Sequence, residues 1–318
     1  MSLPETAPEV AVATQGDGSP NPKRTSVNDG IWAALGAYGL WGFLPILFRL
    51  LEGVPSMLIV AERTVWSLVL LGIILYFSRR LNEVRAVFAD GKKLRRLALC
   101  AVVLAGNWLL YVWAVETEQV LEASFGYFIN PLVNVAIGMA LLGERQNRLQ
   151  MVAILIACVA IAVQAAGIGS VPFVALGLAF SFGFYGFLRK TASVGSGTGL
   201  FVETLILAPI GLLYIFYSIA TEGPGPHADP GMLFLLVMTG PATAVPLMLF
   251  AYGIQRLRLT TIGMLQYLAP TLQFLVAIFL FGEPINATRL FSFALIWLSI
   301  AVFTADGLRQ RRSLRTPA

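Results

Sequence analysis

The chain repeats itself, and the repeated unit lies inside long apolar stretches. In both copies a proline is followed, after eleven residues, by a Gly-Glu pair. The two copies are Pro131 with Gly143-Glu144 and Pro270 with Gly282-Glu283. Aligning them places Asn134 opposite Gln273 and, with a shift of about two residues, Glu62 opposite Glu203. The likeness therefore extends beyond one helix, and we expect a fold of two similar halves.

The apolar stretches are numerous enough to predict an integral membrane protein. Hydrophobic residues make up 57% of the sequence and charged residues only 12%, and the mean hydropathy is +0.77. Crossing about 30 Å of hydrocarbon takes roughly twenty helical residues. Ten stretches are long enough, or nearly so, and we expect spans near residues 31–51, 56–77, 97–115, 121–142, 149–166, 172–190, 198–219, 231–253, 260–281 and 287–305.

These spans predict an all-α polytopic membrane protein of ten transmembrane helices in two inverted repeats of five helices each. An odd number of crossings makes the second half enter the membrane from the opposite side. Inverted repeats of this kind are typical of secondary transporters, whose binding sites lie at the interface between the repeats. The organisation therefore favours transport as the function.

Basic residues collect in every second connection, which predicts the orientation in the membrane. They are Lys23, Arg24, Arg79, Arg80, Arg85, Lys92, Lys93, Arg95, Arg96, Arg145, Arg148, Arg189, Lys190, Arg256, Arg258, Arg309, Arg311, Arg312 and Arg315. We expect these connections and both termini to be cytoplasmic, with the basic loops touching anionic membrane lipids. The net charge of +5 is then a topology signal, and no nucleic-acid partner is expected.

The two ends of the chain differ from the apolar core. Residues 1–29 are rich in Pro, Ser, Thr and Gly and lack a basic start followed by an apolar run. We therefore expect a disordered cytoplasmic tail and not a signal peptide. Residues 306–318 are expected to form a basic cytoplasmic tail.

Signatures of an enzyme are scarce, so the sequence predicts a protein that is not an enzyme. It has one histidine, His227, in an expected outer loop where we assign it no role, and two cysteines, Cys100 and Cys158, inside expected spans. It has no HExxH, no paired CxxC and no GxxxxGK[ST] phosphate loop. We expect no cofactor and no metal, and a lipid-modifying enzyme would need a catalytic cluster that the sequence does not offer.

Ionisable residues inside the expected spans are candidates for coupling, because they are costly in hydrocarbon and usually face the bundle interior. Glu62 and Glu203 are the candidates for proton coupling, and Arg63 with Glu122 is a candidate interhelical ion pair. The alternatives are structural. Glu62 and Arg63 can belong to a bridge near the interface, and Glu203 can reach the cytoplasmic surface or pair with Arg189 or Lys190.

Two expected spans carry matching polar stripes beside a proline, close to the bilayer midplane. The residues are Tyr127, Asn130 and Asn134 in the first repeat and Gln266, Tyr267 and Gln273 in the second. Twin polar, proline-broken segments in corresponding positions point to a substrate-binding site. The alternative is that the amides join helices by hydrogen bonds and the prolines only set helix curvature. Tyr38, Trp41, Asn107 and Trp108 are second-tier candidates for lining, with core packing as their alternative.

Several motifs carry a family resemblance: LGAYGLWGFLPILFRLLEGVPS, NWLLYVWAV, LEASFGYFINPLVNV, LLGER, SFGFYGFLRK, GTGLFVETL and LQYLAPTLQFLVAIFLFGE. Together they resemble the RarD group of EamA transporters, within the drug/metabolite transporter superfamily, over roughly residues 30–305. The resemblance implies two EamA repeats, over 30–166 and 171–305, in a multi-pass inner-membrane permease that works by alternating access around a central cavity. It implies no particular substrate and no catalytic or coupling residues.

We therefore expect a secondary exporter of a small metabolite or drug-like compound, with protons as the coupling ion. Export rests on analogy with the superfamily. The alternatives are a metabolite importer, a passive channel, and a non-transporting membrane sensor or assembly factor.

Overall fold

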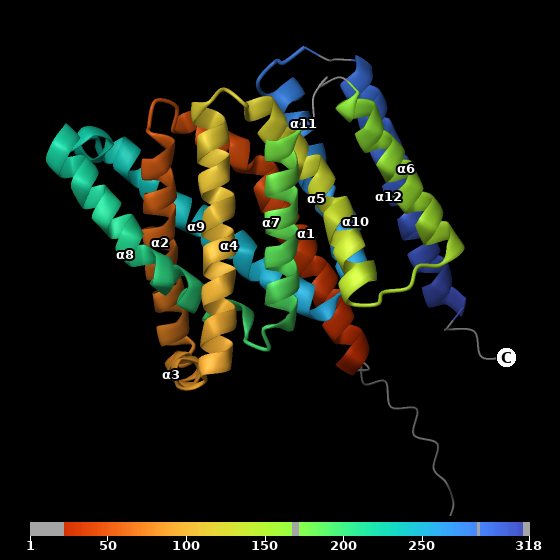
Figure 1. Ribbon diagram of the computed structural model, residues 1–318, viewed down its shortest axis with the longest axis horizontal. Helices are drawn as coiled ribbons and strands as arrows, with labels where there is room; N and C mark the ends of the chain where they lie inside the picture. Colours follow the sequence, from red (N-terminus) through yellow and green to blue (C-terminus); the bar gives the residue numbers. More distant parts are fainter. Residues whose placement is uncertain (1–21, 167–171, 285–286, 314–318) are drawn as a thin grey trace, which may run out of the picture.

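The computed structural model describes residues 22–166, 172–284 and 287–313, and these residues form helices and no strand (Figure 1). The helices are α1 (Pro22–Leu50), α2 (Ser56–Phe77), α3 (Leu81–Ala89), α4 (Gly91–Glu116), α5 (Val120–Leu141), α6 (Arg148–Ala165), α7 (Phe173–Thr191), α8 (Ser196–Glu222), η1 (Gly225–Ala228), α9 (Pro230–Arg256), α10 (Leu259–Gln266), α11 (Leu268–Phe279) and α12 (Ala287–Ser313). An all-helical bundle suits hydrocarbon, because helices satisfy their own backbone hydrogen bonds.

Nine helical segments of the described chain are long and apolar enough to cross a membrane, with α10 and α11 together forming one of them. The tenth expected span is α7, which runs the length of the bundle beside α4 and α5 (Figure 1). It carries Arg189 and Lys190 in its last turn, and these two cations lower its hydropathy. The expected set of ten transmembrane helices is therefore present, with α7 the least apolar member.

The two repeats interlock. In Figure 1, α1 rises from the end of the bundle where the chain begins, whereas α7, the first helix of the second repeat, descends from the other end. Helices of one repeat pack mainly on the other: α1 lies against α9 and α11, α2 against α8 and α9, and α5 against α7 and α10. The helices α6 and α12, which end the two repeats, pack together at the edge of the bundle. The interface between the repeats is thus the core of the molecule.

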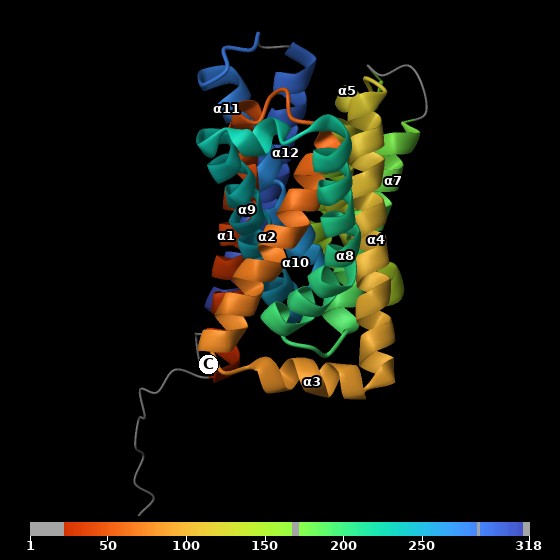
Figure 2. The ribbon, with the colours of Figure 1, turned by 90° about the vertical axis from the view of Figure 1, so that its left-hand side faces the viewer.

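One end of the bundle, called here the basic face, contains the connections from α2 to α4, α5 to α6, α7 to α8 and α9 to α10 (Figure 1). Helix α3 lies across this face, roughly perpendicular to the spans (Figure 2). Glu83 fixes it there by accepting hydrogen bonds from Arg80 Nε at 2.7 Å and from Thr198 Oγ1 at 2.6 Å. These two donors hold the pKa of the Glu83 carboxyl below its ordinary value.

The first helix begins earlier than the sequence predicts. Helix α1 begins at Pro22, so the expectation of a disordered tail over 1–29 is wrong for residues 22–29, while residues 1–21 lie outside the described part of the chain. A proline at the first helical position suits its fixed φ and its missing N–H. The polar turn between Pro22 and Ser26 therefore continues the membrane helix beyond its apolar part.

The two repeat prolines have different effects. In the second repeat the helix is interrupted at Tyr267, between α10 and α11, where Pro270 leaves the carbonyl of Gln266 without its helical donor. In the first repeat Pro131 lies inside an uninterrupted α5. The expectation of twin proline-broken segments is therefore wrong for the first repeat. Gly263 of α10 packs directly on the carbonyl oxygen of Pro131, so the absence of a side chain there allows α10 to approach α5.

Candidate functional site

A cavity of about 120 Å³ lies between the two repeats. Its walls come from α1, α2, α4 and α5 of the first repeat and α7, α9, α10 and α11 of the second. The lining residues are Tyr38, Trp41, Leu44, Phe48, Val60, Arg63, Asn107, Trp108, Tyr111, Tyr127, Asn130, Phe182, Leu247, Gln266, Ala269, Pro270 and Gln273. Phe48 is near the end of α1, Val60 near the start of α2 and Tyr111 near the end of α4. The cavity therefore extends from the middle of the bundle toward the face opposite the basic face.

Three of the predicted amides form one hydrogen-bonded group across the repeats. Asn134, which is fully buried behind the cavity wall, donates through Nδ2 to Gln266 Oε1 at 2.7 Å and to Asn130 Oδ1 at 3.2 Å. Both acceptor residues line the cavity, and Asn134 does not. Because their oxygens face Asn134, the amide nitrogens of Asn130 and Gln266 are the groups left for a ligand.

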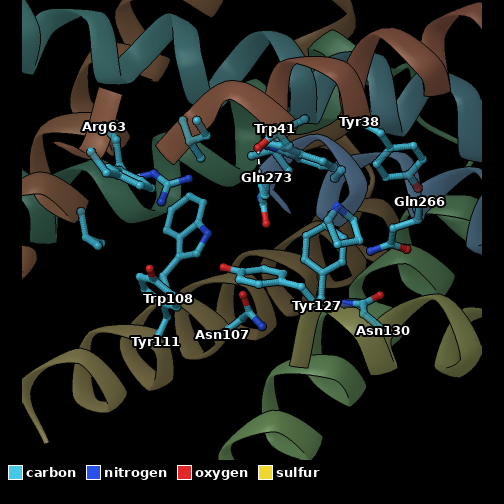
Figure 3. A pocket seen from close by; sticks show the side chains of 17 residues that line it. Tyr38, Trp41, Arg63, Asn107, Trp108, Tyr111, Tyr127, Asn130, Gln266 and Gln273 are labelled. Atoms are coloured by element: carbon cyan, nitrogen blue, oxygen red, sulfur yellow. Dashed lines mark hydrogen bonds between the residues drawn. The ribbon is translucent and has the colours of Figure 1, made fainter. Parts of the chain in front are cut away.

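Gln273 and Tyr127 lie between the two ends of the cavity (Figure 3). Gln273 Nε2 donates to the carbonyl oxygen of Trp41 at 3.1 Å, which leaves its side-chain oxygen toward the cavity. The ring of Tyr127 extends from the Asn130 end toward Trp108, and the ring centroids of Tyr127 and Tyr111 are 6.4 Å apart. The middle of the cavity thus combines aromatic faces with hydrogen-bond acceptors.

Tyr267, by contrast, lies away from the cavity. It is fully buried among apolar residues of α6, α10 and α12, including Ala157, Met264 and Ile296. Consecutive helical residues point about 100° apart, so a neighbour of Gln266 need not share its direction. The structure therefore does not bring Tyr267 together with the other predicted lining residues.

Arg63 reaches the cavity, but not through the expected ion pair. Its Nε donates to Thr243 Oγ1 at 2.9 Å, and its guanidinium carbon lies 4.5 Å from the ring centroid of Trp108. Among the described residues, no Arg63–Glu122 pair lies within the 4.0 Å limit of a salt bridge. The predicted bridge is wrong because Arg63 turns toward α4 and α9, and Glu122 stays in the first turn of α5.

Glu62 faces away from the cavity, toward the connection between α8 and α9. Its Oε1 lies 2.7 Å from His227 Nε2, and its Oε2 accepts from Trp66 Nε1 at 2.8 Å. Only 4% of the Glu62 side chain and 17% of the His227 side chain are exposed. Sequence reasoning assigns His227 no role, because the contact joins residues 165 positions apart. Its surroundings of proline and glycine resemble those of an ordinary loop.

Glu203 is buried in the half of the bundle nearer the basic face. Its Oε1 lies 3.2 Å from Arg189 Nη1, and its Oε2 accepts from the Tyr185 hydroxyl at 3.0 Å. The side chains of Arg189 and Glu203 are both fully buried. Glu203 therefore pairs with Arg189, which is the structural alternative. It does not line the cavity.

Polar contacts join helices at the basic face, and those of Glu144 cross between the two repeats. Glu144, just after α5, accepts from the backbone N–H groups of Leu259 at 2.6 Å and Thr260 at 2.9 Å, and from Thr260 Oγ1 at 2.6 Å. It thereby caps the N-terminus of α10. Lys190 Nζ donates to the carbonyl oxygen of Ile254 at 2.8 Å, which ties α7 to α9.

The repeat mate of Glu144 has the same local backbone but no helix to cap. Gly143 and Gly282 have φ of 64° and 69°, and the N–H groups of Glu144 and Glu283 each donate over 3.0 Å to the carbonyl six residues earlier. The Glu144 side chain is 9% exposed, whereas Glu283 is 52% exposed and forms an ion pair with Arg289 of α12 at 3.9 Å. The equivalent of Leu259 in the first repeat is Val120, the first residue of α5. Leu259 is fully buried and Val120 is 44% exposed.

The model of the EamA-like transporter family matches the chain twice, over residues 28–165 and 170–305. Protein RarD of Salmonella typhimurium is 43% identical over 89% of this chain and 97% of that protein. An uncharacterized transporter of Vibrio cholerae is 39% identical over 92% of this chain and 98% of that protein. A solved crystal structure superposes with a TM-score of 0.67 at 19% identity, covering 90% of this chain and 98% of that one, which is a likeness of fold.

Proposed function

The chain belongs to the EamA-like transporter family, in its RarD group, and from this premise we propose that it is a secondary permease that exports a small metabolite or drug-like compound by alternating access. It lies in the inner membrane with its basic face and both termini in the cytoplasm, as the distribution of Lys and Arg favours. The observation that carries the proposal is the cavity between the repeats, whose walls combine amides and aromatic rings from both.

With this orientation, the described conformation faces outward. The cavity reaches toward the outer half of the bundle, and the contacts of Glu144 with Leu259 and Thr260 join the two repeats in the cytoplasmic half. Alternating access then requires a second conformation in which these contacts open and the outer half closes. The substrate would be released outward from the described state.

The repeat symmetry supplies a mechanism for the second conformation. Glu144 caps α10 at Leu259 in the described state, and the equivalent positions of the other repeat are Glu283 and Val120. We assign Glu283 the role of capping α5 when the protein faces inward, while Glu144 releases α10. A carboxylate at a helix N-terminus is stabilised by the free N–H groups and by the helix dipole. Each conformation would then be held by one of two equivalent caps.

Proton coupling through Glu62 and Glu203 remains part of the proposal. Neither side chain lines the cavity, and each is paired, with His227 and Arg189 respectively. Protonation would therefore weaken a contact near one end of the bundle and would not act on the substrate directly. If Glu62→Gln with Glu203→Gln left both flux and its pH dependence unchanged, coupling through these residues would be ruled out.

The first test compares metabolites inside and outside cells that lack the protein, express it, or express Asn130→Ala with Gln273→Ala. The matched control is Asn82→Ala with Gln310→Ala, because both side chains are exposed and lie outside the cavity. Expression must be equal in all strains. Export predicts a compound class that leaves the cell with wild type and control but not with the cavity variant.

The same experiment separates the alternatives. A compound class that accumulates inside the cell would indicate an importer. Redistribution that neither saturates nor shows counterflow after reconstitution into liposomes would indicate a passive channel. No redistribution under several growth conditions would contradict the exporter and favour a membrane sensor or assembly factor.

A further inference from the structure

The cavity carries one positive charge, and the described residues do not neutralise it. Among the described residues that line it, Arg63 is the one charged side chain, since the other polar groups of the wall are amides, phenols and indoles. The seven ion pairs of the described chain do not include Arg63. The neighbouring carboxylate, Glu62, is held by His227 and Trp66 on another side of α2.

The contacts of Arg63 hold the guanidinium in place and leave part of it free. One nitrogen, Nε, is bound to Thr243, and the face of the group lies on the Trp108 ring. The two Nη groups have no hydrogen-bond acceptor among the described residues and belong to a side chain that lines the cavity. A guanidinium presents paired N–H groups that match a carboxylate. A cation in the membrane interior is costly unless an anion or dipoles compensate it.

The opposite end of the cavity also presents donors. Asn134 occupies the oxygens of Asn130 and Gln266, which leaves their NH₂ groups toward the cavity. Figure 3 shows Arg63 and Trp108 at one end and Asn130 and Gln266 at the other. Between them lie the rings of Trp41 and Tyr127. The lining ring of Phe182 packs edge-on against Trp41, with the ring centroids 5.8 Å apart, and these rings favour a flat apolar body.

We propose that the substrate is a monoanionic organic acid: a carboxylate that pairs with Arg63, an aromatic or otherwise planar body, and a hydroxyl or carbonyl oxygen that binds Asn130 and Gln266. The inference rests on the proposed function, because it names the substrate class of that cavity. A primary amine at the same place would meet Arg63 with no carboxylate to balance it. Cations are therefore rejected, and a neutral isostere of the acid binds without the charge-assisted contact.

The test measures binding to the purified full chain by isothermal titration, with probes of nearly equal shape. These are 4-hydroxyphenylacetate, its neutral amide 4-hydroxyphenylacetamide, the amine tyramine, and acetate as the carboxylate without a planar body. We expect the acid to bind at least ~10-fold more tightly than the amide, and tyramine and acetate to bind more weakly still, because a charge-assisted bidentate pair contributes more than about 1.4 kcal/mol. Equal or tighter binding of the amide or the amine would overturn the proposal, as would an absence of binding by the acid at millimolar concentration.

Two variants locate the effect. Arg63→Gln should reduce affinity for the acid to that of the amide while leaving amide binding unchanged, which also shows that the variant is folded. Retention of the acid preference in Arg63→Gln would overturn the assignment to Arg63. If that variant does not fold, Arg63→Lys, which keeps the charge but not the paired donors, should lower the acid-to-amide ratio. An unchanged ratio would then contradict the proposal.

Failure of this inference is distinguishable from failure of the proposed function. If a neutral or cationic compound is exported, and Asn130→Ala with Gln273→Ala abolishes its export, the proposed permease function is supported and the proposed organic-acid substrate is wrong. If the acid binds in an Arg63-dependent way but no compound redistributes in cells, the proposed acid-binding site is supported and the proposed transport function is wrong.

Discussion

Replacing Glu144 or Glu283 by glutamine should shift the protein between its two conformations in opposite directions. Glu144 accepts three hydrogen bonds at the start of α10, of 2.6, 2.9 and 2.6 Å, in the described state. Hydrogen bonds to charged groups contribute about 1.5–3 kcal/mol each, and a charge at a helix N-terminus about 0.3–1 kcal/mol. Glutamine keeps one acceptor oxygen, so we expect a loss of about 2 kcal/mol, which changes the ratio of the two conformations by a factor of ~30.

The assay measures the accessibility of a cysteine at the start of α10, where the contacts with Glu144 must open to expose the cavity to the cytoplasm. These contacts are called the cytoplasmic gate below. In a Cys100→Ser, Cys158→Ser background, Leu259→Cys places a thiol at a fully buried position whose backbone N–H still reaches Glu144. A membrane-impermeant charged maleimide, added to inside-out vesicles, labels it only when the gate is open. We expect Glu144→Gln to raise the labelling rate ~30-fold and Glu283→Gln to lower it by a similar factor, because each change removes the cap of one conformation.

Val120→Cys supplies the matched control on the outer side, where the position is 44% exposed in the described state. Its labelling from outside should stay high in Glu283→Gln, and in Glu144→Gln it should fall only to the extent that the inward-facing state becomes a large share of the population. Local fraying of α10 would also raise the labelling of Leu259→Cys in Glu144→Gln. It would not explain a lower labelling of Leu259→Cys in Glu283→Gln, because Glu283 is distant from α10. The reasoning is refuted if Glu283→Gln leaves the labelling of Leu259→Cys unchanged, or if both glutamine variants raise it.

Three further changes test the packing that positions the site. Glu203→Ala should lower the free energy of unfolding in detergent by about 3–5 kcal/mol, because it leaves Arg189 buried without a counter-ion, and adding Arg189→Met should restore part of the loss; equal instability of both variants would contradict this. Gly263→Ala should destabilise by about 1–3 kcal/mol, because a Cβ would collide with the carbonyl oxygen of Pro131, whereas Gly39→Ala, with open space around it, should not; equal melting temperatures would refute this. The pKa of Glu83 is lowered, so its contribution to the free energy of unfolding is present above the ordinary carboxyl pKa and is lost as the pH falls through the lowered value. The melting temperatures of wild type and Glu83→Gln should therefore converge on acidification. A constant difference between them would show that the charge of Glu83 is not responsible.

The sequence predicts the membrane helices and the repeats because hydropathy and periodicity are local properties of the chain. Sequence reasoning also assigns Asn130, Asn134 and Gln266 to one site, and these three amides are hydrogen-bonded to one another. Amides near the midplane of two repeat-related helices have few other partners. Tyr267 lies away from the cavity because it follows Gln266 on the helix and points in a different direction, toward α6 and α12. The predicted ion pair of Arg63 with Glu122 is wrong because the guanidinium contacts Trp108 and Thr243 instead. Those contacts depend on the packing between α2, α4 and α9, which local sequence does not predict.

Under the proposed mechanism, the unequal burial of Glu144 and Glu283 belongs to the described conformation. Glu144 and Glu283 end helices with nearly identical backbone geometry, yet one is buried on α10 and the other is half exposed. The repeat-related glutamates Glu62 and Glu203 are both buried and differ in their partners, since one contacts a loop histidine and the other a buried arginine. Under the proposed mechanism, the two repeats exchange the environments of Glu144 and Glu283 without any change in covalent structure. If the proposed alternation holds, a pair of equivalent positions with unequal burial, such as Leu259 and Val120, identifies the contacts that break and form when the cavity changes sides.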